Sequence, residues 1–200
     1  MKNKIWLLGL AMILLAIVAA LALGLAKQSN GPVNPGKPPA LGGTQTAQQA
    51  YAALQRWASK WANDTRTIAV SGSLSRDGLG SGWTFQVYSP KTKKLAIVMV
   101  KEDEVTVVRE QRALYPQQTM SIDAWKLDSE ALLAHWWQER GYVTWANPDA
   151  HTVYLNLSAR EQGLLSWKLS VINPEGDLLE FWEARADTGE TIQVYKPGGG

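Results

Sequence analysis

The 200-residue chain contains no cysteine, and this absence removes several kinds of site at once. Disulfides, thiolate metal centres, a cysteine nucleophile and a lipid-modified N-terminal cysteine are all excluded. Histidine is scarce too: only His135 and His151 occur, and neither has a second ligand at metal-binding spacing. We therefore expect no metal site and no cofactor.

Motifs of known catalytic nucleophiles are also missing. Neither Ser-x-x-Lys nor Gly-x-Ser-x-Gly occurs, and no Ser-His-Asp arrangement stands out. The glycine-rich segment 76–82 lies between two predicted strands and opens no helix, so we expect a hairpin loop and not a phosphate-binding loop. The sequence thus predicts a protein that is not an enzyme.

Acidic residues are absent from the first 44 positions, which carry four lysines. The remaining positions hold 16 basic and 18 acidic side chains, a formal net charge of −2, although the whole chain is at +2. A mildly acidic body without a basic run argues against nucleic-acid binding.

The N-terminal region is dominated by Ile5–Ala26, a long apolar run without a charged side chain. About 20 apolar residues are enough to cross a bilayer as a helix. Lys2 and Lys4 precede the run, so residues 1–4 are expected in the cytoplasm and everything after it outside. A signal peptide cleaved after Ala26 is the alternative, and its apolar core would be unusually long. We interpret 5–26 as a single-pass membrane signal anchor; cleavage there would make the protein secreted.

The rest of the chain has the pattern of an α+β fold in two similar units. A linker rich in Pro and Gly, residues 27–43, is predicted to hold this body off the membrane. The units are expected at 44–112 and 127–200, with a connector at 113–126. Each begins with a helix by periodicity, at 44–64 and at 128–140, the latter closed by Gly141 as its C-cap. Each continues as an antiparallel meander, with strands predicted at 67–74, 83–89, 95–101 and 105–109, and at 152–157, 167–172, 178–183 and 191–195.

Two segments suggest that one unit was duplicated. Trp83–Thr92 and Trp167–Gly176 both have Trp first, a large apolar residue third, Val fifth and Pro eighth. The shift that brings Trp83 onto Trp167 also lays the predicted helices and first strands over each other without gaps. Identities are few, so coincidence is the alternative. The period is longer than that of common solenoid repeats, which favours two packed units over an array.

The end of the second unit, Leu178–Val194, reads LLEFWEARADTGETIQV, a strand, a Thr-Gly turn and another strand. It resembles the closing hairpin of PepSY and PepSY-like domains, and the resemblance extends over residues 125–194. The first unit has Lys101–Val105 in place of the Thr-Gly turn. The resemblance implies one helix on a curved antiparallel sheet (a cystatin-like arrangement), with tandem units similar to the β-lactamase-inhibitor-like fold. It also implies a place outside the bacterial membrane, a role in inhibiting or regulating peptidases, and no catalytic residues.

Tryptophan is the most abundant aromatic residue, with ten copies against two of phenylalanine. Trp137, Trp145 and Trp182 are the candidates for exposure. Trp137 is adjacent to Trp136, so one of the two must point differently on a helix, and Trp182 is out of phase with Leu179 and Phe181, which are taken as the core side. These three are the candidate interaction surface, since exposed Trp is enriched at binding hot spots; burial between the units is the alternative. We predict a protein-interaction module of the cell envelope that inhibits or regulates a peptidase. The alternative is an envelope sensor that binds a small ligand, lipid or cell-wall fragment in a Trp-lined concavity.

Overall fold

The computed structural model describes residues 45–76 and 80–197 of the chain. The first helix, α2 (Ala47–Trp61), begins at a capping box, in which Thr46 Oγ1 accepts a hydrogen bond from the Gln49 amide and the Gln49 side chain accepts one from the Thr46 amide. Its buried stripe is built mostly from alanine: Ala47, Ala50, Ala53, Leu54 and Ala58. Small side chains bring the helix close to the sheet, so the large core side chains come from the strands.

The first meander consists of four antiparallel strands, β1 (Arg66–Ser75), β2 (Gly80–Ser89), β3 (Lys94–Lys101) and β4 (Glu104–Arg112). Only Glu102 and Asp103 connect β3 to β4, and both have positive φ, 50° and 66°. This mirror-image turn matches the twist of the flanking strands. The first unit therefore makes its closing hairpin with a very short turn, where the second has its Thr-Gly segment.

The second half has the same order of elements. Its helix α3 (Ser129–Trp136) starts at the N-cap Asp128, passes through a π-helical turn, η2 (Trp137–Gly141), and continues as α4 (Tyr142–Ala146). Short 3-10 turns, η1 (Ile122–Ala124) and η3 (Glu161–Gly163), lie in the connecting segments. The strands are β5 (Thr152–Ala159), β6 (Leu165–Ile172), β7 (Leu178–Arg185) and β8 (Thr191–Tyr195).

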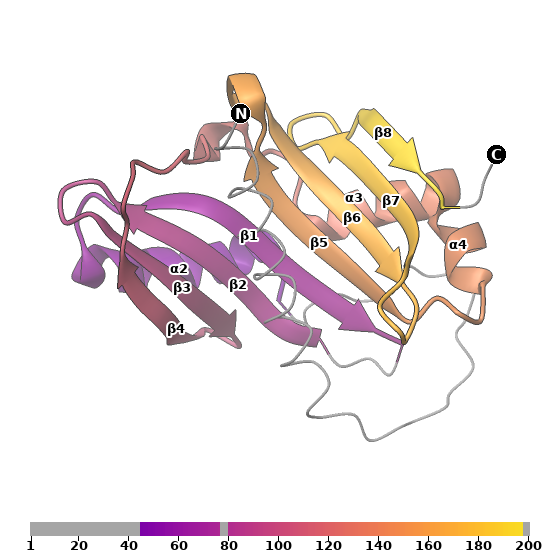
Figure 1. Ribbon diagram of the computed structural model, residues 1–200, viewed down its shortest axis with the longest axis horizontal. Helices are drawn as coiled ribbons and strands as arrows, with labels where there is room; N and C mark the ends of the chain where they lie inside the picture. Colours follow the sequence, from indigo (N-terminus) through magenta and orange to yellow (C-terminus); the bar gives the residue numbers. More distant parts are fainter. Residues whose placement is uncertain (1–44, 77–79, 198–200) are drawn as a thin grey trace. The chain divides into compact units, whose positions relative to one another are not determined.

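All eight strands form one antiparallel sheet, in the order β4-β3-β2-β1-β5-β6-β7-β8 (Figure 1). The two meanders join where β1 pairs with β5, with Gly72 opposite Leu155 at the centre. Helices α2 and α3 both lie behind the sheet in Figure 1, one over each meander. The predicted α+β class is confirmed, and the two halves share one continuous sheet.

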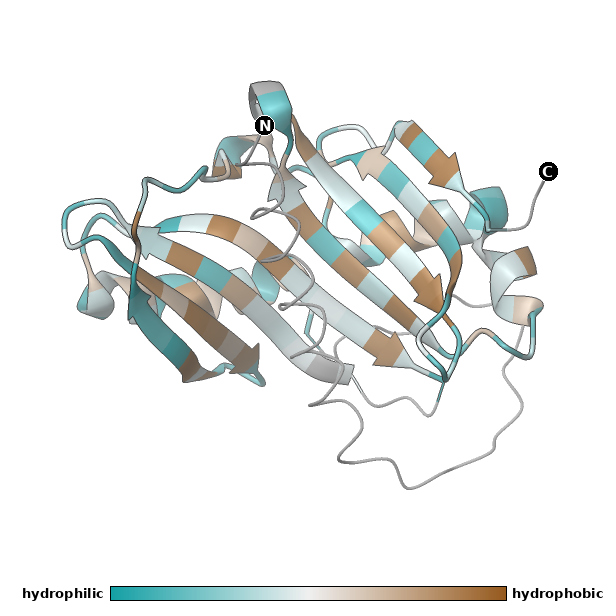
Figure 2. Ribbon diagram, in the orientation of Figure 1, coloured by the Kyte–Doolittle hydropathy of each residue, from teal (hydrophilic) through white to brown (hydrophobic). Residues whose placement is uncertain are grey.

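Hydropathy alternates along the central strands, as expected for a sheet with one covered face (Figure 2). The covered side carries the buried tryptophans Trp83 and Trp167, both fully inaccessible, together with the aliphatic side chains of β5. The other side of the same strands carries polar groups, and Asn156 Nδ2 donates to Ser71 Oγ across the β1–β5 junction at 3.0 Å. One apolar core thus runs under both halves.

The internal repeat is visible in the strand register. Trp83 lies opposite Val100 in the β2–β3 pair, and Trp167 lies opposite Ala184 in the β6–β7 pair, so these strands follow the shift predicted from the sequence. Both indoles donate a hydrogen bond to a backbone carbonyl: Trp83 Nε1 donates to the Gln45 carbonyl, and Trp167 Nε1 donates to the Leu127 carbonyl, each at 2.9 Å. Gln45 and Leu127 are the residues immediately before the N-caps of α2 and α3.

The prediction that one shift aligns the helix, the first strand and the Trp-led hairpin without gaps is wrong. The N-caps Thr46 and Asp128 are separated by fewer positions than the two tryptophans. The residues that pair with the two tryptophans across the neighbouring strands are Gly72, opposite Trp83, and Leu157, opposite Trp167. Gly72 and Leu157 are separated by more positions in the sequence than the two tryptophans are. Equivalent positions of the two halves must be buried alike, and the connecting turns differ in length so that these positions still coincide.

The predicted anchor, 5–26, and linker, 27–43, lie outside the described residues. Within 45–76 and 80–197, no helix has both the length and the apolar character needed to cross a membrane.

Candidate interaction surface

The three tryptophans predicted to form an exposed surface are buried, and that prediction is wrong. Trp137 is 8 %, Trp145 3 % and Trp182 0 % exposed. Trp137 packs edge-on against its neighbour Trp136, with ring centroids 6.1 Å apart. Adjacent helical residues both reach the core here because the π-helical turn begins at Trp137 and widens the helix.

The prediction for Trp182 is wrong because it assigns the two faces of β7 the wrong way round. The core side carries Glu180, Trp182 and Ala184, all fully buried, whereas Phe181 points to the other side and is half-buried. A glutamate in the alternating pattern argues for solvent on that side, since Glu is rarely buried unless paired. The structure supplies the pairing.

Glu180 lies at the centre of a buried polar cluster, here called the Glu180 cluster. Its Oε1 accepts from Trp136 Nε1 at 3.0 Å and from Arg140 Nε at 2.9 Å. Its Oε2 accepts from Thr144 Oγ1 and lies 3.0 Å from Lys196 Nζ. These donors come from α3, η2, α4 and the segment after β8, so one carboxylate ties four pieces of chain to β7.

The protonation of Glu180 follows from these partners. Burial by itself raises the pKa of the Glu180 carboxyl, but the hydrogen bonds from Thr144, Trp136 and Lys196, with the charge of Arg140, outweigh it and lower the pKa below its ordinary value. The group is therefore an anion at neutral pH, held by two cations. Removing one partner of a buried ion of this kind is costly, because an uncompensated charge is left behind.

The helix does not end at Gly141, so the predicted C-cap is wrong. Gly141 has helical φ and ψ, −59° and −35°, and the chain continues into α4. A Cβ built on Gly141 would lie 2.6 Å from the Trp136 ring, so glycine is required here by close packing and not by a turn. The consequence is that Tyr142 and Val143 emerge on α4, where they are 51 % and 63 % exposed.

Four exposed apolar side chains lie on two elements at this end of the second half, Tyr142 and Val143 on α4 and Val194 and Tyr195 on β8, and they are together called the α4–β8 patch. On β8 the register places Val194 on the Trp182 side of the sheet and Tyr195 on the Phe181 side. Hydrogen bonds connect their surroundings: Thr191 Oγ1 of β8 donates to Glu139 Oε2 of η2 at 2.9 Å, and Lys196 Nζ, directly after β8, donates to Thr144 Oγ1 of α4 at 3.2 Å. In the described residues β8 pairs with β7 alone, so it forms a sheet edge.

Sequence reasoning misses the α4–β8 patch. Tyr142 and Val143 follow Gly141, which the local pattern predicts to be a helix stop. Val194 and Tyr195 are correctly predicted on a strand, but their exposure depends on that strand lying at the edge. The available signal is the pair of bulky residues directly after Gly141, which a helix continuing past the glycine would expose.

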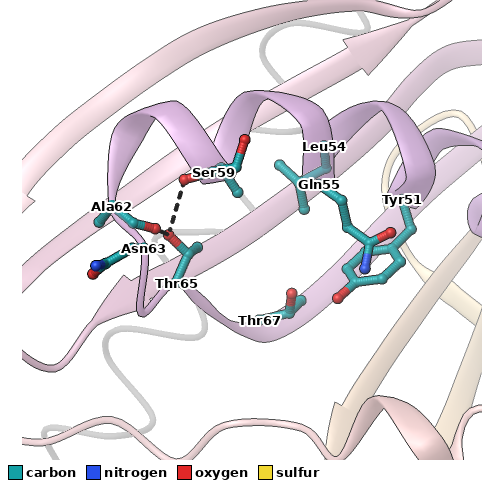
Figure 3. A pocket seen from close by; sticks show the side chains of 9 residues that line it. Tyr51, Leu54, Gln55, Ser59, Ala62, Asn63, Thr65 and Thr67 are labelled. Carbon is teal, nitrogen blue, oxygen red and sulfur yellow. Dashed lines mark hydrogen bonds between the residues drawn. The ribbon is translucent and has the colours of Figure 1, made fainter.

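A shallow hollow lies between α2 and the start of β1 (Figure 3), with a volume of about 210 Å³. Polar groups of Gln55, Ser59, Asn63 and Thr65 line it, together with Tyr51. Thr65 Oγ1 bonds the carbonyls at the end of α2, Ala62 at 2.5 Å and Ala58 at 3.4 Å, so part of the polar lining already has partners. No tryptophan lines this hollow.

The two histidines lie apart. His135 Nε2 is 3.1 Å from Glu139 Oε1, an i,i+4 pair in which both side chains are somewhat over one third exposed. His151 Nδ1 lies 2.9 Å from Thr152 Oγ1. In the part of the chain that the structure describes, no three His, Cys, Asp or Glu side chains are placed to share a metal ion.

Comparisons with known proteins give little. No protein-family model and no curated protein matches the chain. Among solved structures, the chain is similar to a candidate lipoprotein of Clostridium difficile 630, with a TM-score of 0.48 and 9 % identity, over 74 % of this chain and 92 % of that one.

Proposed function

We propose that this protein is a protein-interaction module held outside the cytoplasm by the segment 5–26, and that it binds its partner through the α4–β8 patch. The observation that carries the proposal is the exposure of Tyr142, Val143 and Tyr195, each above one half, beside an open strand edge. Tyrosine is enriched at binding hot spots because it combines apolar area with a polar end.

The support beneath the patch favours binding over accidental exposure. The Glu180 cluster joins α4 to β7 and to the segment after β8, so the exposed side chains are presented on a fixed base. Less side-chain and loop ordering then has to occur on association, which favours affinity. The β8 edge adds backbone groups to which an extended partner segment could pair.

A peptidase of the envelope is the first partner class to test, and regulation of that enzyme is the proposed role. The resemblance of residues 125–194 to PepSY-like domains motivates this choice. We do not assign catalysis to the module.

The test is site-specific photocrosslinking with the full chain in its native membrane. A photoreactive phenylalanine replaces Tyr142 or Tyr195 in the patch, or Tyr115 as the control; Tyr115 is 76 % exposed and lies in the connector after β4. We expect a discrete protein adduct from the two patch positions only, and its loss when Val143→Ser is added. Identification of the adduct as a peptidase would support the regulatory role.

Two results would overturn the assignment. The first is the absence of any protein adduct from both patch positions. The second is an identical adduct pattern from Tyr115, which would show capture of abundant neighbours and not recognition by the patch.

A further inference from the structure

The end of the first half carries a second exposed apolar group, in a basic setting. Leu114 and Tyr115, directly after β4, are the most exposed large hydrophobic side chains in the described residues, at 86 % and 76 %. Next to them lies the β2–β3 turn. The Ala113 amide donates to the Lys93 carbonyl at 2.8 Å, and Lys94 pairs with Arg112 across the two strands.

We propose that this corner, here called the β4 tip (the turn Pro90–Lys94 with Arg112–Tyr115), docks on an anionic lipid surface. The proposal rests on the membrane tether of the proposed function but not on its protein partner. Leu114 and Tyr115 would enter the headgroup region, and the lysines would lie against the lipid phosphates.

The charges of the β4 tip fit this occupant. Lys91, Lys93, Lys94 and Arg112 are all exposed. Two carboxylates lie beside them: Glu110, 2.7 Å from Lys94 Nζ, and Asp64, which accepts from the Lys91 amide at 2.7 Å. The tip is therefore net positive on a body that is net negative. Basic side chains that lie close to an anionic membrane are attracted to it, and several of them add up.

The apolar side chains of the β4 tip also fit an anionic lipid surface. Tyr and Trp side chains combine an apolar body with a polar end and favour the membrane interface, and Leu side chains add apolar area there. Trp61 lies just behind the tip, half-buried and stacked on Trp57, and its Nε1 donates to Glu110 at 2.7 Å. The same Glu110 accepts from Lys94 at 2.7 Å, so the helix end holds the basic turn in place.

The tether length permits the contact. The linker follows the predicted anchor at once and joins α2 near Thr46, whereas the β4 tip lies near the other end of that helix, at Trp61. The helix, 15 residues long, spans about 22 Å. The linker 27–43 extends to at most about 61 Å, so the tip can reach the bilayer that holds the anchor. A short tether also keeps the local concentration of lipid high, so weak docking suffices.

The experiment uses the absence of cysteine, which makes a single introduced thiol unique. Full-length Tyr115→Cys and Tyr142→Cys proteins, each labelled with an environment-sensitive fluorophore, are reconstituted in phosphatidylcholine vesicles with or without phosphatidylglycerol. Spin-labelled lipids quench a fluorophore that lies at the interface. We expect quenching at position 115 about twofold or more above that at position 142, only with phosphatidylglycerol, and weaker at high salt.

A matched variant tests the basic residues. Lys91→Gln, Lys93→Asn and Arg112→Gln together are expected to abolish the excess quenching at position 115; Asn is chosen because Lys93 has φ of 55°. Unchanged tryptophan fluorescence confirms that the fold is kept. If the variant misfolds, Leu114→Ser in the otherwise unchanged chain provides the second test, with the same expected loss.

Two quenching results would overturn the proposal: equal quenching at positions 115 and 142, or quenching that does not depend on lipid charge. A third would be protection of the thiol at position 115 from labelling in native membranes only, which would indicate an acidic protein as the occupant. Failure of the proposed membrane anchor can be distinguished from failure of tip docking by an alkaline carbonate wash. A chain without an anchor is released from the vesicles by the wash, whatever the fluorophore reports.

Discussion

The indole rings of Trp83 and Trp167 meet edge to face where the two halves join, with centroids 6.4 Å apart and planes at 65°. Each ring also donates its N–H to the carbonyl that precedes the helix of its own half. The pair therefore links two equivalent structural roles across the β1–β5 junction. It places the strongest sequence signal of the repeat at the centre of the shared core.

This contact makes a prediction about cooperativity. In a double-mutant cycle of Trp83→Phe and Trp167→Phe, we expect each single change to cost about 2 kcal/mol, from a lost hydrogen bond and a smaller buried ring. The coupling between them should be about 0.5–1.5 kcal/mol, the range for aromatic pairs. Urea unfolding gives all four free energies. A coupling of zero would show that this ring contact contributes nothing to the joining of the halves.

The buried carboxylate of Glu180 predicts a stability loss that depends on charge. Glu180→Gln keeps the shape but leaves Arg140 and Lys196 without their anion, and we expect a cost of about 3 kcal/mol. Glu183→Gln is the control, because Glu183 is also buried but its partners among the described residues are fewer: it accepts from Ser166 at 2.7 Å and lies 3.5 Å from Arg160. A smaller loss in the free energy of unfolding, of about 1 kcal/mol, is expected there.

The effect of Glu180→Gln on the free energy of unfolding is expected to depend on pH. The pKa of Glu180 is lower in the folded state than in the unfolded state, so its contribution is fully present above the unfolded pKa and disappears as pH falls through the folded one. The difference in unfolding free energy between the wild type and Glu180→Gln should be constant near neutral pH and shrink below about pH 4. A difference that grows on acidification would contradict the assigned direction.

Arg76 links the two halves through contacts that we expect only arginine to make. Its guanidinium donates to the carbonyls of Trp145 at 2.5 Å and Asn147 at 2.7 Å, and lies 5.0 Å from the centre of the Trp145 ring. Lysine cannot reproduce this fork. Arg76→Lys should increase hydrogen exchange in residues 142–151, with a loss of about 1–2 kcal/mol. The exposed Arg66→Lys should leave exchange there unchanged; equal effects would refute the link.

The close packing of Gly141 predicts an unusual response to alanine. In an ordinary helix Gly→Ala stabilises by about 1 kcal/mol. Here the added methyl group would enter the Trp136 ring, and we expect a net loss of about 1–3 kcal/mol by thermal unfolding. Trp136→Phe added to Gly141→Ala should relieve part of the clash. A stabilised Gly141→Ala protein would show that α4 shifts easily.

Much of the secondary structure follows from local pattern. The alanine-rich stripe of α2 and the alternation along β5 and β6 are predicted within a few residues of their observed ends, because each depends on periodicity in a single segment. The face of β7 is not, because the burial of Glu180 depends on cations that arrive from η2 and from beyond β8. The exposure of Tyr142 escapes prediction for a related reason: only packing against Trp136 shows that Gly141 continues the helix.

The sequence by itself determined the α+β class, the two helix-plus-meander halves, and the tryptophan early in the second strand of each, since these depend on short-range patterning. Only the tertiary structure decided that β1 pairs with β5 into one sheet, that Trp137, Trp145 and Trp182 are buried, and that exposed apolar groups lie at the α4–β8 patch and the β4 tip. Exposure is a property of what else packs nearby. Periodicity says which residues share a face, but the partners that cover that face come from distant parts of the chain.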